Sequence, residues 1–195
     1  MKRESLQGRS MSFPLPMISW SHFSMIRGFH LADFITLGNG SNDILELAAR
    51  SLVSPGQSVV YSQYSFAVYP LATQAVGARA IVVAAKDFGH DLPAMRAAIT
   101  DDTRLVFVAN PNNPTGTAIS RDEIIKILKT APNAVVLIDE AYVEFADVSV
   151  LDLISEYSNL VVSRTFSKAY GMAGIRFGCM FSKSENIAWV RKAQS

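Results

Sequence analysis

The sequence lacks the features of a disulfide scaffold, a membrane protein or a nucleic-acid-binding protein. A single cysteine among 195 residues excludes a disulfide framework. Lys and Arg together number 18 against 17 for Asp and Glu, so the net charge of +1 gives no electrostatic basis for binding nucleic acid or an anionic membrane. No apolar run approaches the ~20 residues of a membrane span. These absences predict a soluble, cytoplasmic protein whose partners are small molecules.

Two further expectations follow from composition. Cys179 has no histidine near it in the sequence, so we expect a small buried hydrophobic side chain rather than a nucleophile. Residues 1–33 contain four of the seven methionines without a clear period, and Pro14 and Pro16 interrupt their weakly apolar stretch. We therefore expect an irregular N-terminal segment that is not a secretion signal.

From Ile35 onward, short β-branched runs alternate with amphipathic stretches, and Gly, Pro and Asn lie between them. This alternation predicts an α/β fold with a mostly parallel sheet and helices on both faces. Expected helices span 41–52, 66–76, 92–99, 120–129, 150–157 and 184–193, and expected strands span 58–61, 80–84, 105–109, 134–138, 160–163 and 175–181. We expect Ser41 or Asn42 to cap the first of these helices, and Ser120 with Glu123 to form a capping box.

Ligands of an open parallel sheet bind outside the carboxyl ends of the strands, so the segments after each strand are the candidate site. The first is a glycine-rich turn at 37–43, which opens into a helix whose N-terminus suits an anion. The second, at 110–116, contains two Asn-Pro steps that hold an asparagine amide at a strand end. No Gly-Lys-Ser/Thr follows it, which excludes a P-loop.

The third and fourth segments contain the charged candidates. Asp139 ends an apolar strand, where a buried carboxylate needs a cationic partner; a helix cap, a turn or a Mg²⁺ ligand are the alternatives. Lys168 is flanked by hydroxyl residues and followed by glycines, so removal from water would make its amine nucleophilic; an ordinary surface lysine is the alternative. The two residues are 29 positions apart, about one strand–helix–strand unit, which predicts that they share one edge of the sheet.

Together the four segments resemble the fold-type-I pyridoxal-phosphate aminotransferases, and most closely the histidinol-phosphate aminotransferases, from about Phe34 to Gln194. In that family the lysine of the Ser-Lys-Ala-Tyr-Gly segment carries the cofactor as a Schiff base, which here implies Lys168. The resemblance further implies that Asp139 pairs with the pyridinium nitrogen, and that Asn113 and Tyr142 hydrogen-bond the ring's phenolic oxygen. Lys168, Asp139 and Tyr142 are thus the expected catalytic residues.

The same resemblance implies the remaining contacts of pyridoxal 5'-phosphate. The phosphate is expected to be held by Gly40, Ser41, Asn42, Thr165, Ser167 and Arg176. Phe66 is expected to stack on the ring, with Tyr64 as the alternative. No metal site is expected.

The function implied by the resemblance is transamination between histidinol phosphate and 2-oxoglutarate in histidine biosynthesis, by a homodimer. Residues 1–33 contain no counterpart of the family's N-terminal arm tyrosine, and the small domain with its carboxylate-binding arginine is expected beyond Ser195. Residues 34–195 are therefore expected to form a partial cofactor-binding large domain. The alternatives are a catalytically silent fragment that binds the cofactor weakly or not at all, and a related decarboxylase that acts on a phosphate substrate.

Overall fold

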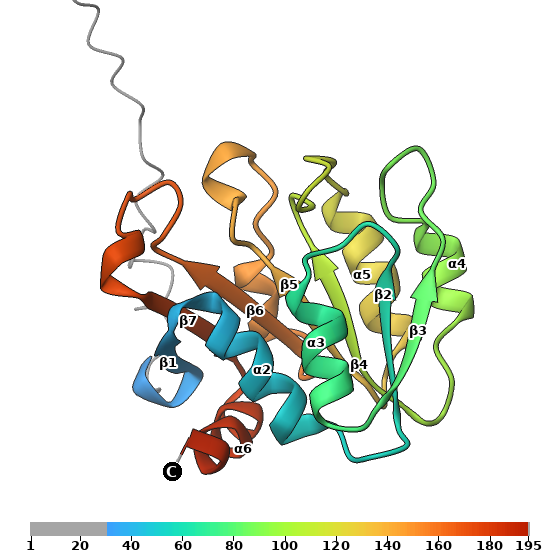
Figure 1. Cartoon of the computed structure of the whole chain (residues 1–195), viewed down its shortest axis with the longest axis horizontal. Helices are drawn as coiled ribbons and strands as arrows, with labels where there is room; N and C mark the ends of the chain where they lie inside the picture. Colours follow the sequence, from blue (N-terminus) through green and yellow to red (C-terminus); the bar gives the residue numbers. More distant parts are fainter. Residues whose placement is uncertain (1–30, 195) are drawn as a thin grey trace, which may run out of the picture.

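A mixed seven-stranded sheet organises residues 31–194, the part of the chain that this computed structural model describes (Figure 1). The strands are β1 (Ile35–Asn39), β2 (Ser58–Ser62), β3 (Arg79–Val83), β4 (Thr103–Ala109), β5 (Val135–Asp139), β6 (Leu160–Thr165) and β7 (Phe177–Ser182). Their order across the sheet is β1-β7-β6-β5-β4-β2-β3. Of the irregular segment expected at 1–33, residues 1–30 lie outside the described residues, and residues 31–33 belong to a short 3-10 helix.

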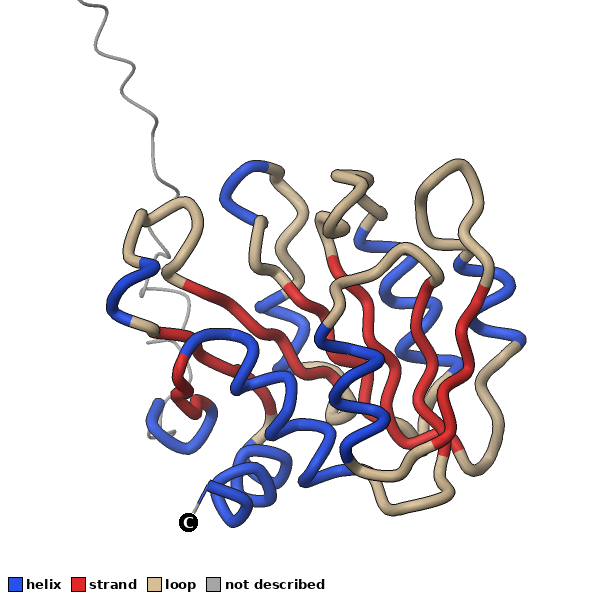
Figure 2. The backbone as a smooth tube through the Cα atoms, viewed as in Figure 1, coloured by secondary structure: helices blue, strands red, loops and turns tan. Residues whose placement is uncertain are grey.

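The helices connect the strands and cover both faces. They are α2 (Gly40–Leu52), α3 (Val68–Ala75), α4 (Leu92–Ala97), α5 (Arg121–Thr130) and α6 (Ser184–Gln194), with 3-10 turns η1 (Leu31–Phe34), η2 (Val143–Phe145), η3 (Leu151–Ser155) and η4 (Ala173–Ile175). Figure 2 shows that the loops after β4, β5 and β6 gather at one edge of the sheet. This edge is where the sequence places the candidate residues.

The strand directions agree with the predicted fold class, with one addition. Strands β2 to β6 pair in parallel, whereas β7 runs antiparallel to both β6 and β1. The alternating pattern did not reveal this reversal. It occurs because β7 follows β6 through a loop and a single 3-10 turn, and a parallel return would require a crossover helix. The α/β fold with a mostly parallel sheet is confirmed.

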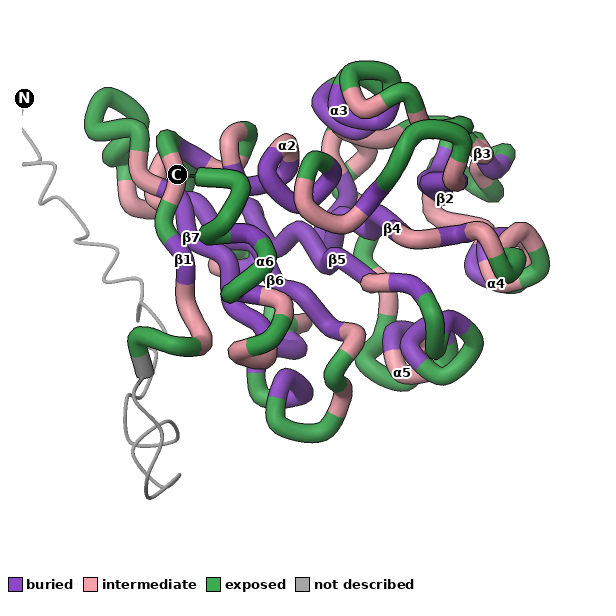
Figure 3. Tube along the Cα trace, turned by 90° about the horizontal axis from the view of Figure 1, so that it is seen from below, coloured by how far each residue is buried: buried purple, intermediate pink, exposed green. Residues whose placement is uncertain are grey.

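The core lies on both faces of the central strands. Along β4, Leu105 and Phe107 pack toward α2, α3 and α6, whereas Val106 and Val108 pack toward α4, α5 and η3. All four side chains are fully buried, as expected for a strand covered on both faces. Figure 3 shows α2 and α3 on one side of the buried strands, with α4 and α5 on the other. The burial makes the central strands a rigid base for the loops at their carboxyl ends.

The predicted cap of α2 is wrong. The helix begins at Gly40, and the N-cap residue Asn39 makes no side-chain cap bond. Instead the carboxylate of Asp43 turns back and accepts the Asn39 N–H at 2.9 Å. Ser41 and Asn42, the expected caps, lie in the first helical turn, which leaves them available to the cleft described below.

The other local predictions succeed in part. Ser120 caps α5 by accepting the Glu123 N–H at 3.4 Å, as predicted. The Glu123 side chain pairs with Arg96 and Lys126 rather than completing a capping box. The helix expected at 150–157 is only the 3-10 turn η3. Its N-cap residue Val150 donates its N–H to the side chain of Glu140, at 2.7 Å.

Candidate active site

A cleft at the carboxyl ends of β4, β5 and β6 brings the candidate residues together. Every residue that the resemblance assigns to the cofactor site lines this cleft except Gly40 and the alternative Tyr64. The lining residues are Ser41, Asn42, Phe66, Ala109, Pro111, Asn113, Asp139, Ala141, Tyr142, Thr165, Ser167, Lys168 and Arg176. The parallel registers explain the clustering, because Ala109 pairs with Asp139 and Asp139 pairs with Ser163 across neighbouring strands.

Asp139 is the buried carboxylate at the base of the cleft. Its Oδ1 accepts a hydrogen bond from Ser163 Oγ at 2.8 Å, and its Oδ2 accepts one from the Tyr69 hydroxyl at 3.1 Å. Burial raises the pKa of Asp139, while these two hydrogen bonds and the charge of Lys168 oppose the increase. The carboxylate is therefore a buried anionic group with few surrounding charges to balance it.

Groups that attract negative charge lie where α2 begins. The N-terminus of α2 carries partial positive charge, and Ser41 and Asn42 of its first turn line the cleft. Arg176 donates from Nη2 to the carbonyl of Asn39 at 3.4 Å, which holds the guanidinium beside the same turn. Gly40 leaves room for this approach, because a Cβ at that position would lie 2.5 Å from Arg176 Nη2.

Two hydroxyl residues complete what we call the anion cradle, formed by Ser41, Asn42, Thr165, Ser167 and Arg176. The Thr165 hydroxyl accepts the Ser167 N–H at 3.2 Å, which fixes the turn after β6. Ser167 Oγ is buried yet has no hydrogen-bond partner among the described residues. Buried hydroxyls are normally satisfied, so an unpartnered one in a cationic cleft fits an oxyanion ligand.

Lys168 lies at the cleft but is not withdrawn from water. Its Nζ is 5.2 Å from the centre of the Tyr142 ring, and the side chain is exposed. The position of Lys168 therefore agrees with the alternative of a surface lysine, and the removal from water that would make its amine more nucleophilic is absent from the described structure. The loop after β6 carries the lysine beyond the sheet edge, where the residues from 171 to 176 are also exposed.

The loop with two Asn-Pro steps presents Asn113 to the cleft. Both of these peptide bonds are cis. Asn110 fixes the loop at its base by donating to Ile119 O at 3.2 Å and accepting from Ile119 N at 2.9 Å. Asn112 donates to the Tyr64 carbonyl and to Thr115 Oγ1, each at 2.8 Å. With its neighbours held in this way, Asn113 is the asparagine of this loop that lines the cleft.

The structure distinguishes the two candidate stacking residues by position. Phe66 lines the cleft and packs edge-on against Tyr69, with ring centres 6.1 Å apart. Tyr64 stacks instead on Phe88, with ring centres 5.9 Å apart, and is not among the lining residues. Of the two candidates, Phe66 is therefore the one that lies at the cleft.

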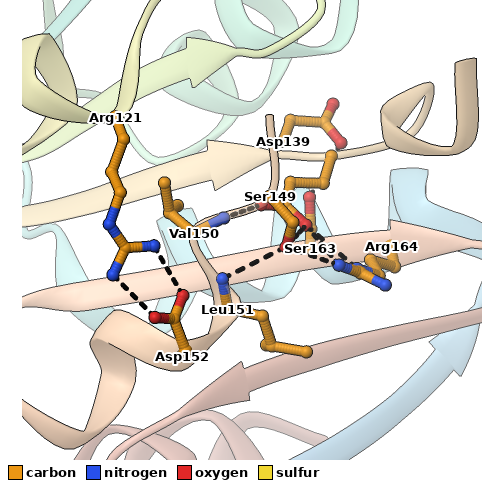
Figure 4. A network of polar contacts seen from close by, with 9 residues as sticks. Arg121, Asp139, Ser149, Val150, Leu151, Asp152, Ser163 and Arg164 are labelled. Atoms are coloured by element: carbon orange, nitrogen blue, oxygen red, sulfur yellow. Dashed lines mark hydrogen bonds and ion pairs between the residues drawn. The ribbon is translucent and has the colours of Figure 1, made fainter. Parts of the chain in front are cut away.

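A buried ion pair lies directly behind the cleft and was not predicted. Glu140 accepts from Arg164 Nη2 at 2.7 Å and from Arg164 Nε at 3.0 Å, and both residues are buried. Glu140 also accepts from Ser149 Oγ at 3.0 Å and from the Val150 N–H at 2.7 Å. Figure 4 shows Ser149 beside Arg164. These contacts close the loop that carries Tyr142.

Sequence reasoning missed Tyr69, Ser163, Glu140 and Arg164 as parts of the site. Glu140 directly follows Asp139, and Ser163 and Arg164 end the strand before Lys168, so position at strand ends was an available signal. No local pattern pointed to Tyr69, because its role depends on how α3 packs over the sheet.

Other features of the described residues contribute no competing site. A second hollow of about 370 Å³ lies at the amino ends of β4 to β6, where Asn159 donates to the carbonyls of Leu128 and Ala131. No helix within residues 31–194 is long and apolar enough to cross a membrane. Over the same residues, no group of three or more His, Cys, Asp or Glu side chains could hold a metal ion.

Cys179 is buried, as predicted, and burial raises its pKa to about 12.

The chain matches the sequence profile of the family "Aminotransferase class I and II" over residues 28–195, and it belongs to this family. It is 60% identical over 158 residues to histidinol-phosphate aminotransferase 1 of Cupriavidus pinatubonensis, covering 78% of this chain and 42% of that protein. It is 61% identical over 150 residues to histidinol-phosphate aminotransferase 2 of Ralstonia nicotianae, covering 74% and 40%. The chain thus spans about two fifths of the length of these relatives.

Solved structures show the same fold. Histidinol-phosphate aminotransferase from Sinorhizobium meliloti, solved in complex with pyridoxal-5'-phosphate, superposes with a TM-score of 0.78 and 27% identity, covering 88% of this chain and 48% of that one. A histidinol-phosphate aminotransferase from Clostridium acetobutylicum gives a TM-score of 0.78 and 28% identity, covering 90% and 52%. An L-threonine-O-3-phosphate decarboxylase from Porphyromonas gingivalis, at 24% identity and a TM-score of 0.74, shares the fold.

Proposed function

We propose that the cleft binds pyridoxal 5'-phosphate and that the whole protein transfers amino groups between histidinol phosphate and 2-oxoglutarate. The observation that carries the proposal is the coincidence of an anion cradle, a buried carboxylate and a primary amine in one cleft. A phosphate, a protonated ring nitrogen and an aldehyde need these three groups. When bound, the cofactor supplies an electron sink for the substrate's α-carbon.

The anion cradle is the proposed phosphate site. The N–H groups of Ser41 and Asn42 at the start of α2 favour negative charge there. The unpartnered hydroxyl of Ser167 offers a hydrogen bond, and the guanidinium of Arg176 offers a planar pair of donors. Thr165 also lines the cleft, and its hydroxyl orients Ser167 by accepting the Ser167 backbone N–H.

The remaining residues have roles at the ring. Asp139 would hold the ring nitrogen protonated, and Phe66 would cover one face of the ring. Asn113 and Tyr142 would hydrogen-bond the phenolic oxygen. Lys168 would provide the amine that attaches the cofactor, and would afterwards move a proton at the substrate's α-carbon. Its exposed position leaves the amine accessible to an incoming aldehyde.

The attachment can be tested directly. Purified protein is mixed with pyridoxal 5'-phosphate, reduced with borohydride and digested, and the modified peptide is identified by mass spectrometry. We expect the modification on Lys168 and its loss in Lys168→Ala. Lys129→Ala changes an exposed lysine at the end of α5 and should retain it. Equal labelling of the Lys168→Ala variant would refute the assignment.

The substrate is supported by the names of the relatives at about 60% identity. Because the chain spans about two fifths of their length, the alternative of a catalytically silent polypeptide is kept. An assay with histidinol phosphate and 2-oxoglutarate separates the two, since sustained glutamate formation would refute silence. The decarboxylase alternative is supported only by a shared fold at 24% identity.

A homodimer and a cytoplasmic location remain predictions for the whole protein. Light scattering of the purified protein with and without the cofactor would measure the oligomeric state. Fractionation of cells that produce a tagged protein would measure its location.

A further inference from the structure

We propose that Tyr69 is a positioning residue for Asp139, acting together with Ser163 to keep this buried carboxylate ionised and oriented toward the cleft. The inference deepens the proposed function, and only its consequence for the cofactor rests on that function. The hydrogen bonds that carry it exist within the chain itself, and they can be tested without any ligand.

Tyr69 is held rigidly enough to act as a fixed donor. Its side chain is fully buried on α3, and its ring stacks on Phe107 of β4 with ring centres 4.5 Å apart and planes within 2° of parallel. Phe66 contacts it edge-on, at 89° between the planes. A ring packed on two sides has little rotational freedom, so its hydroxyl stays directed at Asp139 Oδ2.

The two neutral donors are divided between the two carboxylate oxygens. Tyr69 donates to Oδ2 and Ser163 donates to Oδ1, from elements on different sides of β5. Each carboxylate oxygen can accept more than one hydrogen bond, so this arrangement fixes the plane of the carboxylate and leaves acceptor capacity toward the cleft. Because Tyr69 and Ser163 are both uncharged, they hold Asp139 without neutralising its negative charge.

The balance of charge around Asp139 makes these donors important. The groups that face it are the Tyr69 hydroxyl from α3, Ser163 from β6, the backbone N–H of Ala141 from the following loop, and the charge of Lys168. Burial raises the Asp139 pKa, and all four groups lower it. Lys168 is exposed and therefore screened by water, so the ionised form depends largely on the hydrogen bonds. Burial is the largest cause that raises the pKa of Tyr69. The contact with Asp139 raises it further, because an ionised Tyr69 would face the negative charge of the carboxylate.

A protonated Asp139 would be a poor partner for a ring nitrogen that has to remain protonated. A neutral Asp139 lacks the negative charge that stabilises a protonated ring nitrogen, so the charge-assisted hydrogen bond between the two groups is lost. Loss of the Tyr69 hydroxyl would therefore weaken the ring's electron-withdrawing character while leaving the anion cradle and Lys168 unchanged.

The test measures the Asp139 carboxyl group by NMR in cofactor-free protein labelled with ¹³C at the aspartate carboxyl carbon. The Asp139→Asn variant identifies its signal by the loss of that signal. We expect the titration midpoint to rise by about one pH unit in Tyr69→Phe, which is a tenfold change in proton affinity, and to rise in Ser163→Ala. Tyr61→Phe is the matched control, because Tyr61 is also buried, with its ring centre 6.5 Å from that of Tyr69, but is not among the groups that act on Asp139.

An unchanged midpoint in both Tyr69→Phe and Ser163→Ala would overturn the proposal, as would an equal rise in Tyr61→Phe. Circular dichroism establishes whether each variant is folded. If Tyr69→Phe does not fold, the Ser163→Ala variant still tests the proposal. A second measurement titrates each protein with pyridoxal 5'-phosphate, and we expect Tyr69→Phe to bind about tenfold more weakly than Tyr61→Phe. If the wild-type protein fails to bind the cofactor, the proposed function fails, while the carboxyl titration still decides the role of Tyr69.

Discussion

Arg164 and Glu140 form a buried ion pair that joins the end of β6 to the loop after β5. The guanidinium donates to Glu140 Oε2 through both Nη2 and Nε, and it also donates to Ser149 Oγ at 2.8 Å. The loop between Glu140 and Val150 contains Tyr142, and β6 leads directly to the anion cradle and Lys168. The pair therefore fixes the relative position of two parts of the proposed site.

Removing one partner of this pair should be strongly destabilising. Arg164→Met leaves the Glu140 carboxylate buried without its cation, and we expect a loss of about 3–5 kcal/mol in the free energy of unfolding, measured by urea titration. The matched control is Arg121→Met, which breaks the exposed bidentate pair with Asp152 seen in Figure 4. That change should cost less than about 1 kcal/mol. Equal losses for the two variants would contradict the assigned importance of burial.

Gly40→Ala should weaken anion binding in addition to its effect on the fold. An added Cβ would meet the end of the Arg176 side chain, which can move away, so the guanidinium is displaced from the cradle. Gly40 and Gly56 both have left-handed backbone, with φ of +81° and +84°, and a Cβ at Gly56 meets nothing within 4 Å. Both variants should lose about 1–2 kcal/mol from backbone strain.

Only Gly40→Ala should reduce affinity for pyridoxal 5'-phosphate, by about tenfold, as expected for a disturbed charge-assisted contact. The measurement is an absorbance titration of both variants with the cofactor. Similar affinities for Gly40→Ala and Gly56→Ala would show that Arg176 does not contact the phosphate.

The stacking residue can be identified by substitution. Phe66→Leu keeps an apolar side chain in the cleft but removes the ring face, so we expect affinity for the cofactor to fall about threefold to tenfold. Tyr64→Leu should leave affinity unchanged, because Tyr64 stacks on Phe88 outside the lining of the cleft. The reverse order of effects, measured by the same titration, would assign the role to Tyr64.

Cys179 should be unreactive in the folded protein. The side chain is buried, and burial raises its pKa from 9.0 to about 12, so the reactive thiolate is scarce at pH 8. We expect slow modification by a thiol-specific disulfide reagent, and complete modification after unfolding in guanidinium. The stability that this group contributes is fully present below pH 9 and is lost as the pH rises toward 12, since the unfolded chain releases the proton first. Rapid modification of the native protein would contradict this interpretation.

The sequence predicted the architecture well where its signals were local. Apolar runs such as 134–138 have the length and composition of strands buried on both faces, and residues after parallel strands meet at one edge of the sheet. Asp139 and Lys168 were singled out in this way, whereas Asn113 was selected from the 110–116 loop by the resemblance to the family. Strand β1 was not found, because its five residues end in Gly38 and Asn39, which were expected to belong to a glycine-rich turn.

The rest of the site depends on contacts between distant segments. Tyr69 reaches Asp139 across 70 positions, through the packing of α3 on the sheet, and no spacing in the sequence encodes that approach. The sequence left the exposure of Lys168 open between two alternatives, because it depends on the course of the loop after β6 rather than on the residues beside the lysine.

The contact between Arg176 and Asn39 spans 137 positions, and β1 is paired with β7 alone. During synthesis the strands β2 to β6 emerge before β7, so they can assemble while the start of α2 still lacks its arginine. Competence to bind an anion should consequently arise late, as a step separate from formation of the central sheet. Ribosome-bound chains of increasing length would show this step as a sudden gain of phosphate binding once β7 has left the exit tunnel.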